Sequence, residues 1–193
     1  GIQPMTVTYR DHGYTMVYNG EIYNREELNR ELSLAGIDVK TRSDTETVLW
    51  AYALWGKECP KKLNGIFAFA VYETAEDLLF LCRDRLGVKP LYYTFAGETF
   101  LFASELKALL AYPGVKREVD KKGLHELLFL APVTLPESGT FKQIKKLLPG
   151  EYALVKEGKL TKAPYWQLTP KPFTDTREQA VQTVRELVTD ATR

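Results

Sequence analysis

The sequence predicts an α+β fold in which antiparallel sheets are flanked by helices. Three observations support this prediction. Apolar residues recur at helical spacing in 24–36, and a second helix is predicted over 43–56, between a capping Ser43 and a terminating Gly56. Two continuous apolar and aromatic runs, 65–73 and 78–84, are separated by a polar turn, which is typical of an antiparallel pair with both faces buried. Hairpin patterns continue after these runs, and helices that are segregated from hairpins are characteristic of layered α+β proteins.

The first elements can be placed in order along the chain. Residues 6–18 predict a β-hairpin with its turn at residues 11–13, because β-branched and aromatic residues surround Asp-His-Gly. Each of the two helices that follow begins with a capping box, in which an N-cap side chain and a Glu three residues later satisfy free backbone N–H groups. The two boxes are Asn24 with Glu27 and Ser43 with Glu46.

The second half of the chain combines hairpins with short helices. Gly97 marks the turn of one hairpin, and Glu157-Gly158 marks the turn of another. Asp120 is placed to cap a helix. The predicted elements are hairpins at 90–104 and 150–162 and helices at 104–112, 120–130 and 176–193.

The composition argues against several classes of protein. The 193 residues carry a net charge of +1, so neither a nucleic-acid partner nor a membrane surface is indicated. The apolar stretches are too short to span a bilayer. The two cysteines, Cys59 and Cys82, occur in unrelated contexts and indicate reduced thiols in a cytoplasmic protein. With two histidines and no Cys-x-x-Cys pattern, the sequence offers no basis for a metal site.

The stretch VYNGEIYN at residues 17–24 allows two interpretations. Asn-Gly is a strong hairpin signal, because both residues tolerate positive φ, and Glu21 would then be a solvated charge. Alternatively, Gly20 lets the backbone approach a ligand, and the Asn19 amide beside an exposed backbone N–H offers two donors for an oxyanion hole. Glu21 would then hold a cation, such as the amino group of a ligand. Residue chemistry alone leaves both interpretations open.

Three further polar motifs occur at the ends of predicted elements. They are residues 43–46 at a helix start, residues 83–90 between two strands, and residues 103–105 where a strand gives way to a helix. Taken singly, each has a structural explanation: a capping box, a loop whose charges are solvated or paired with one another, and a helix start. The lysines within residues 142–146 are interpreted as a solvated face.

Taken together and in order, the motifs NGEIYN, SDTE, LNGIFAFA, RDRLGVKPLYY, ASELKALL and LLPGEY resemble the glutamine-amidotransferase domain of glutamine-hydrolysing asparagine synthetases. The resemblance extends from the first residue to the linker near residue 170. Other class II amidotransferases share single motifs, but GEIYN, FAFA and GVKPLYY together favour the asparagine synthetase branch. The resemblance implies an N-terminal-nucleophile (Ntn) hydrolase fold, which is an αββα sandwich of antiparallel sheets with flanking helices.

The resemblance also implies roles for individual residues. In this family a thiolate attacks the side-chain amide of glutamine, and donors stabilise the charge that forms on the carbonyl oxygen. The donors map to the Asn19 side chain and the Gly20 N–H, and Glu21 and Asp44 match positions that hold the α-amino group of the substrate. Ammonia then passes within the parent protein to a C-terminal synthetase domain. There ATP and Mg²⁺ activate aspartate for conversion to asparagine, so no cofactor is expected in this chain itself.

The sequence departs from the family in three ways. The catalytic Cys of the family, and an Arg for the substrate carboxylate, belong to a segment that would precede Gly1. No Ser-Gly-Gly-x-Asp-Ser pyrophosphate loop occurs, and the last helix has no partner domain. Cys59 and Cys82 are not expected to substitute, because one lies in a loop and the other in a buried strand. We therefore expect an inactive fragment of an active parent, with an unpaired sheet edge that favours a homo-oligomer.

The expected domain organisation has three parts. Residues 1–168 are assigned to the amidotransferase domain without its nucleophile segment, 169–175 to a linker, and 176–193 to the first helix of the synthetase domain.

An alternative function stays open at this point. The chain could be a non-catalytic Ntn-type scaffold or binding domain, as in β-lactam synthetases, or part of another class II amidotransferase. The four residues Asn19, Gly20, Glu21 and Asp44 favour the glutaminase, because a domain that no longer hydrolyses glutamine has no chemical need for all of them.

Overall fold

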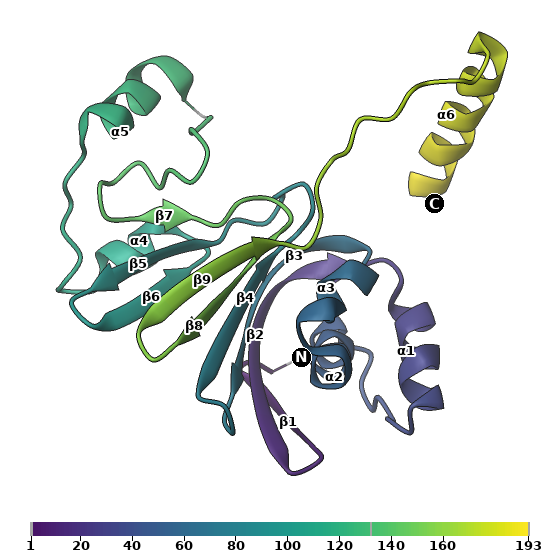
Figure 1. Cartoon of the computed structure of the whole chain (residues 1–193), viewed down its shortest axis with the longest axis horizontal. Coiled ribbons are helices and arrows are strands. Elements are labelled where there is room, and N and C mark those ends of the chain that lie inside the picture. Colours follow the sequence, from purple (N-terminus) through teal and green to yellow (C-terminus); the bar gives the residue numbers. More distant parts are fainter. Residues whose placement is uncertain (1, 132, 193) are drawn as a thin grey trace.

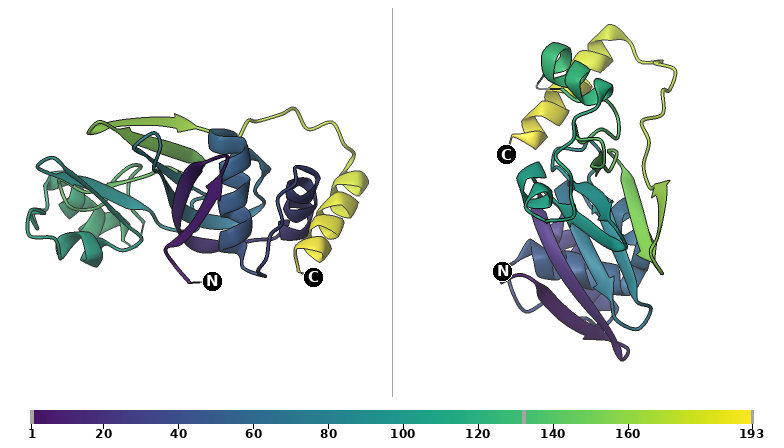
Figure 2. Two further views of the ribbon diagram at one scale, coloured as in Figure 1. Left: turned by 90° about the horizontal axis from the view of Figure 1, so that it is seen from below. Right: turned by 90° about the vertical axis from the view of Figure 1, so that its left-hand side faces the viewer.

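The chain folds into four layers, in the order helix, sheet, sheet, helix (Figures 1 and 2). A computed structural model describes residues 2–131 and 133–192. The larger sheet has the strand order β1-β2-β3-β4-β8-β9, and every neighbouring pair is antiparallel. Its strands are β1 (Met5–Tyr9), β2 (His12–Ile22), β3 (Gly65–Glu73), β4 (Leu78–Arg83), β8 (Glu151–Lys156) and β9 (Lys159–Pro164).

The smaller sheet has the order β6-β5-β7, and its strands are β6 (Thr99–Ala103), β5 (Tyr92–Ala96) and β7 (Lys145–Lys146). Helices α1, α2 and α3 lie on the outer face of the larger sheet, and α4 lies on the outer face of the smaller one. The helices are α1 (Arg25–Leu34), α2 (Asp44–Trp55), α3 (Cys59–Lys62), α4 (Leu106–Leu110), α5 (Lys121–His125) and α6 (Arg177–Ala191). This arrangement confirms the predicted αββα sandwich of antiparallel sheets.

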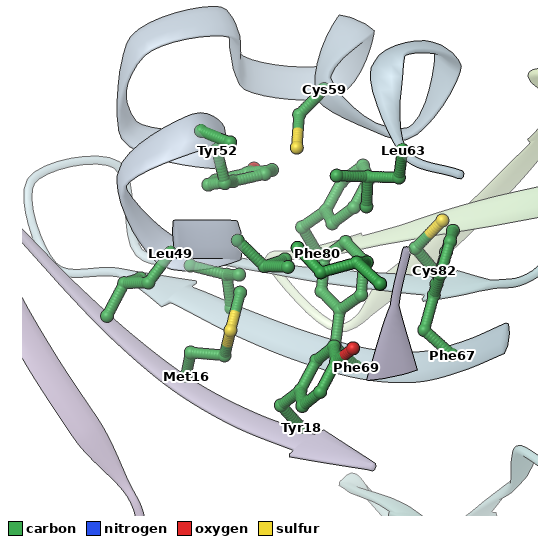
Figure 3. Packing of buried hydrophobic residues seen from close by; sticks show 14 of the residues in the cluster. Met16, Tyr18, Leu49, Tyr52, Cys59, Leu63, Phe67, Phe69, Phe80 and Cys82 are labelled. Atoms are coloured by element: carbon green, nitrogen blue, oxygen red, sulfur yellow. The ribbon is translucent and has the colours of Figure 1, made fainter. Parts of the chain in front are cut away.

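The main core lies between the larger sheet and α2 (Figure 3). Tyr52 of α2 packs against Phe80 of β4, with ring centroids 4.7 Å apart. The buried side chains in this core include Met16, Tyr18, Leu28, Leu49, Tyr52, Leu63, Phe67, Phe69 and Phe80. Each fully buried side chain of this size stabilises the fold by about 1.5–3 kcal/mol relative to exposure.

A second core fills the space between the two sheets. Small residues of the larger sheet, Ala68, Ala70 and Ala153, pack against Tyr93 of β5 and against Leu91, which directly precedes that strand. Strand β3 therefore buries side chains on both faces, which is why its sequence is a continuous apolar run and not an alternating one. The prediction of a doubly buried antiparallel pair at 65–73 and 78–84 is confirmed.

The first hairpin turns one residue earlier than predicted. Arg10 and Asp11 both have positive φ, at 49° and 65°, and Tyr9 pairs with His12. Two successive residues with positive φ form the two-residue turn whose twist matches a hairpin. The predicted turn at residues 11–13 is therefore wrong, and His12 and Gly13 belong to β2. The turns predicted at Gly97 and Glu157-Gly158 are confirmed.

Neither predicted capping box forms in α1 or α2. The Asn24 side chain instead binds the end of α3 and the residue before β3: its Nδ2 donates to the Lys62 carbonyl at 3.0 Å, and its Oδ1 accepts from the Asn64 N–H at 2.9 Å. The Ser43 side chain makes no capping hydrogen bond. Both helices still begin where the sequence places them, within one residue.

The later helices are shorter than predicted. Asp120 caps α5 as expected, since its Oδ1 accepts from the Gly123 N–H at 2.9 Å. After His125 the chain continues as a single π-helical segment, Glu126–Leu130. The two-residue strand β7 lies within residues 142–146, whose lysines are predicted to form a solvated face. Lys142 and Lys145 are exposed as predicted, whereas Lys146 is half-buried.

The chain leaves the sandwich after β9 through an extended segment and ends in α6 (Figure 2). Thr176 and Gln179 form a capping box at the start of α6, and the helix has no buried residue. Within the described part of the chain, no helix is both long enough and apolar enough to cross a membrane.

Candidate active site

Three of the four predicted site residues lie within strand β2. The strand continues to Ile22, so the Asn-Gly-Glu motif is inside it and does not follow it. The register pairs Asn19 with Ala68, Gly20 with Phe67 and Glu21 with Ile66. The interpretation of Asn-Gly as a hairpin turn is therefore wrong.

Gly20 is required by the close approach of β2 and β3. A Cβ atom on residue 20 would lie 2.4 Å from the Ile66 carbonyl oxygen and 2.7 Å from the Phe67 Cα. The φ of Gly20 is not positive, so the glycine is not there to form a turn. Only a residue without a side chain fits between these backbone atoms.

The backbone N–H of Gly20 points to an open edge of the larger sheet. On either side of it, the Tyr18 N–H donates to Gln3 Oε1 at 2.7 Å, and the Ile22 N–H donates to Asp44 Oδ2 at 2.9 Å. Strand β1 pairs with β2 only as far as Met16, so it does not cover this part of the edge. Because alternate residues of an antiparallel strand direct their N–H groups to the same side, Gly20 faces this edge as well.

The side chains of Asn19 and Glu21 lie on the opposite face of β2 from the main core, because alternate side chains of a strand point to opposite faces. Both side chains are exposed. Asn19 Nδ2 is 3.5 Å from Ser104 Oγ, just beyond the end of β6. The Asn19 amide thus lies beside Ser104, where the smaller sheet ends.

Asp44 brings a carboxylate to the same edge from the first turn of α2. Its Oδ2 accepts the Ile22 N–H, and its Oδ1 lies 3.7 Å from Arg25 Nε. The side chain is 22% exposed, so it is oriented by the protein and still accessible to a ligand. A negative charge is also favoured at the start of a helix.

One open pocket of about 490 Å³ contains all four predicted site residues. Its lining residues are Gln3, Tyr18, Asn19, Gly20, Glu21, Arg42, Ser43, Asp44 and Thr45. Gln3 and Arg42 are not among the residues that the sequence predicts for the site. Because Arg42 directly precedes the Ser-Asp-Thr-Glu motif, its position indicates that it could line the pocket. No motif near Gln3 indicates that this residue belongs to the site.

The pocket combines charges of both signs. Glu21 and Asp44 supply two carboxylates, and Arg42 supplies the one positive side chain among the described residues that line it. Burial raises the pKa of Tyr18, and the nearby charges of Asp44 and Glu21 raise it further, so its hydroxyl stays protonated. This arrangement is complementary to a small molecule with both an ammonium and a carboxylate group.

A second pocket of about 260 Å³ adjoins the first and shares Gln3, Tyr18 and Asn19 with it. Its other lining residues come mainly from the space between the sheets, and they include Ala68, Ala70, Leu91, Phe102 and Ser104. The Asn19 amide therefore stands between a polar pocket and a more apolar one.

Comparison with known proteins gives the family. The profile of the family described as "Glutamine amidotransferase domain" matches residues 1–166. The chain belongs to this family. It is 45% identical over 191 residues to asparagine synthetase [glutamine-hydrolyzing] 3 of Bacillus subtilis (strain 168). The aligned region covers 99% of this chain and 31% of that protein. Asparagine synthetase [glutamine-hydrolyzing] 1 of the same organism is 35% identical over 193 residues, or 99% of this chain and 30% of that protein.

The chain spans about a third of the length of these two relatives. Among solved structures, glutamine phosphoribosylpyrophosphate amidotransferase from B. subtilis matches with a TM-score of 0.62 and 19% identity. That match covers 86% of this chain and 32% of the other. At this level of identity the likeness concerns the fold, and it agrees with the Ntn-type sandwich.

Within this amidotransferase domain, the loop of residues 83–90 begins with two buried charged residues, Arg83 and Asp84. The Arg83 guanidinium donates to the carbonyls of Lys89, Leu147 and Gly87 at 2.8, 2.7 and 2.5 Å. The Asp84 carboxylate accepts from the N–H groups of Leu86, Val88 and Lys89 at 2.9–3.1 Å. Backbone groups satisfy both buried charges, so the interpretation of the loop's charges as solvated is wrong for Arg83 and Asp84.

The two thiols of the domain are structural. Cys59 and Cys82 are both fully buried and unpaired. Burial raises the pKa of each thiol well above its ordinary value, which disfavours the nucleophilic thiolate. Neither thiol lines the candidate pocket. The expected buried-strand position of Cys82 is confirmed, whereas the expected loop position of Cys59 is wrong, because Cys59 begins α3. That neither thiol replaces a catalytic cysteine stays a prediction.

The described residues, 2–131 and 133–192, include no group of three or more His, Cys, Asp or Glu side chains placed to hold a metal ion. The donors of the candidate site do not suit ATP-bound Mg²⁺ either. Glu21 and Asp44 share their pocket with Arg42, and one oxygen of Asp44 is already occupied by the Ile22 N–H.

Proposed function

We propose that this chain is the glutamine-hydrolysing domain of a glutamine-dependent asparagine synthetase. The observation that carries the proposal is the edge of β2, where the Gly20 N–H and the Asn19 amide lie in one pocket with Glu21 and Asp44. The family membership and the similarity to two glutamine-hydrolysing asparagine synthetases support it.

The proposed chemistry is amide hydrolysis through a thiolate. A cysteine of the parent protein attacks the side-chain carbonyl of glutamine, and negative charge develops on its oxygen. The Asn19 Nδ2 and the Gly20 N–H stabilise this oxyanion, and donors of this kind are worth roughly 3 kcal/mol each to the transition state. When the intermediate collapses, the C–N bond breaks, and the nitrogen takes up the proton given up by the thiol and leaves as ammonia. Water then hydrolyses the remaining thioester, which releases glutamate and restores the thiol.

The charges of the pocket are proposed to orient the substrate. Glu21 and Asp44 accept hydrogen bonds from the α-ammonium group, since charge-assisted hydrogen bonds are about twice as strong as neutral ones. Asp44 is already fixed by the Ile22 N–H, so it requires little reorganisation on binding. Arg42 supplies a positive charge near the α-carboxylate, besides any arginine from elsewhere in the parent protein.

The fate of the ammonia belongs to the rest of the polypeptide. We infer that it is used by a synthetase domain in the same chain, in which ATP and Mg²⁺ activate aspartate for amidation to asparagine. No residue described here is assigned to ATP or Mg²⁺, and no step in this domain depends on them.

The test is a glutaminase assay on the parent protein, after its N-terminal sequence and mass have been measured. We expect an N-terminal Cys and a glutamate release that a thiol-directed glutamine analogue abolishes. A parent without that Cys that releases no glutamate would contradict the proposal, and the domain would then be a scaffold that has kept the pocket without its chemistry.

A further inference from the structure

The side chain of Gln3 forms a two-point contact with one residue of β2. Gln3 Nε2 donates to the Tyr18 carbonyl at 2.8 Å, and the Tyr18 N–H donates to Gln3 Oε1 at 2.7 Å. A side-chain amide carries the same donor and acceptor groups as a peptide bond. Gln3 therefore pairs with Tyr18 as a residue of a neighbouring strand would.

This contact occurs where β2 lacks a neighbouring strand. The last pair between β1 and β2 is Met5 with Met16. Tyr18 is therefore the first residue beyond β1 whose backbone N–H and carbonyl face the free edge of β2. Ile22, four residues further on, is held by Asp44. Gly20 lies midway between these two fixed points and directs its N–H to the same edge.

We propose that Gln3 is a positioning residue for glutamine hydrolysis, which fixes the edge of β2 so that the oxyanion donors are held in place. The inference depends on the function proposed above. Gln3 lines the same pocket as both donors. Gln3 at one end and Asp44 at the other therefore hold the backbone segment that carries the Gly20 N–H and the Asn19 side chain. Such control matters because a misplacement of about 1 Å can cost roughly 100-fold in rate.

The role predicts a specific kinetic effect in the parent protein. In Gln3→Glu, the ionised carboxylate still accepts the Tyr18 N–H but cannot donate to the Tyr18 carbonyl. We expect kcat for glutamine hydrolysis to fall about 10–100-fold per active site, with KM nearly unchanged, because the donors act mainly in the transition state. Titration of active sites with a thiol-directed glutamine analogue corrects for any misfolded fraction.

The dependence on pH distinguishes positioning from a loss of stability. Once protonated, the carboxyl group introduced by Gln3→Glu has a donor again, so the ratio of kcat for this variant to kcat for the wild type should rise as the pH is lowered. The titratable and charged side chains that face this position from the pocket are Tyr18, Glu21, Arg42 and Asp44, and they are the same in both proteins. Gln3→Met removes both hydrogen bonds without adding a charge, so it should show the loss without the recovery.

Gln143→Glu serves as a matched control. Gln143 Oε1 also accepts a backbone N–H, from Lys116, but it does not line the candidate pocket. Its kcat ratio to wild type should stay close to one at every pH. A Gln3→Glu protein with wild-type kcat per titrated site, or a reduced kcat whose ratio does not change with pH, would overturn the role of Gln3 and leave the proposed function intact. A wild-type parent that releases no glutamate would overturn both.

Discussion

Asn19 and Gly20 are neighbours in β2, but they reach the candidate site in different ways. Asn19 contributes its side chain, on the face of the larger sheet near Ser104. Gly20 contributes only its backbone N–H, at the edge of the strand. A β-strand sends side chains and backbone groups in perpendicular directions, so two successive residues can supply donors to one point.

Loss of the Asn19 donor should slow glutamine hydrolysis. We expect Asn19→Ala in the parent protein to lower kcat by about 10²–10³, with a smaller change in KM, because the hydrogen bond forms chiefly as charge develops. Asn19→Asp should be impaired at least as strongly, since a carboxylate would repel the oxyanion. Steady-state kinetics of glutamate release measure both. A kcat for Asn19→Ala within about 3-fold of wild type would exclude this role.

Gly20→Ala should destabilise the fold before any effect on chemistry is considered. The added methyl group meets backbone atoms of Ile66 and Phe67, which cannot rotate away, so β2 and β3 must separate. We expect a loss of about 1–3 kcal/mol in the free energy of unfolding, the usual cost of overpacking. Urea denaturation of the 193-residue chain, followed by tryptophan fluorescence, would show it.

Gly13→Ala in the same strand is the comparison for this experiment. Its methyl group would meet only the Thr74 side chain, whose hydroxyl can move. Its loss should therefore be the smaller of the two. Equal losses at both positions would show that the approach of β3 is not what requires Gly20.

At the scale of elements, long-range contacts decide how α2 begins. Glu46 does not complete a capping box with Ser43. Its carboxylate instead accepts the N–H groups of Lys40 and Thr41, at 3.0 and 2.6 Å, and so closes the loop before the helix. This loop also carries Arg42, so the contact fixes part of the pocket rim.

The contact predicts a pH-dependent stability. Burial tends to raise the pKa of Glu46, but the hydrogen bonds from Thr41 and Lys40 outweigh it and hold the pKa below its ordinary value. A carboxyl whose pKa is lower in the folded state stabilises the fold above its unfolded value of 4.5, and this contribution disappears as the pH falls through the folded-state pKa. Glu46→Gln should therefore cost about 1–2 kcal/mol near pH 7 and progressively less below pH 4.5. Urea midpoints of both proteins across this range test it, and a pH-independent difference would contradict it.

The sequence predicts elements well where the pattern is local. The doubly buried pair β3 and β4 and the hairpin of β8 and β9 were found from apolar runs and turn residues. The continuation of β2 through Asn19 and Gly20 is not predicted, because Asn-Gly locally favours a turn over a strand. The close approach of Ile66 and Phe67, more than 40 residues away, decides between the two.

The same reasoning applies to the candidate site. Its four predicted residues line one pocket, and their functional roles stay predictions. The sequence does not predict Gln3 as a site residue, because its partner, Tyr18, is 15 residues away and the contact exists only once the strand edge has formed. Asn24 and Ser43 were misassigned as caps because local capping competes with long-range partners, as the contacts of Asn24 show.

At the scale of the whole molecule, α6 stands apart from the core of the sandwich, because the helix has no buried side chain. Every large apolar side chain on α6 is more than half exposed. The last residues that pack against the sandwich are Tyr165, which is 8% exposed and whose hydroxyl donates to the Arg83 carbonyl at 2.8 Å, and Trp166. We therefore propose that residues 1–168 form an independent folding unit, and that 169–175 link it to the region that begins with α6.

Truncation tests this boundary. A chain ending at Leu168 should unfold at nearly the same urea concentration as the 193-residue chain, within about 0.5 kcal/mol, because none of the described residues that it lacks, 169–192, is buried. A chain ending at Pro164 also loses Tyr165 and Trp166, whose N–H groups both donate to the Gly150 carbonyl. It should lose about 3–5 kcal/mol, the usual cost of removing a buried aromatic side chain. A large loss already at Leu168 would show that α6 stabilises the sandwich, and the proposed boundary would then be wrong.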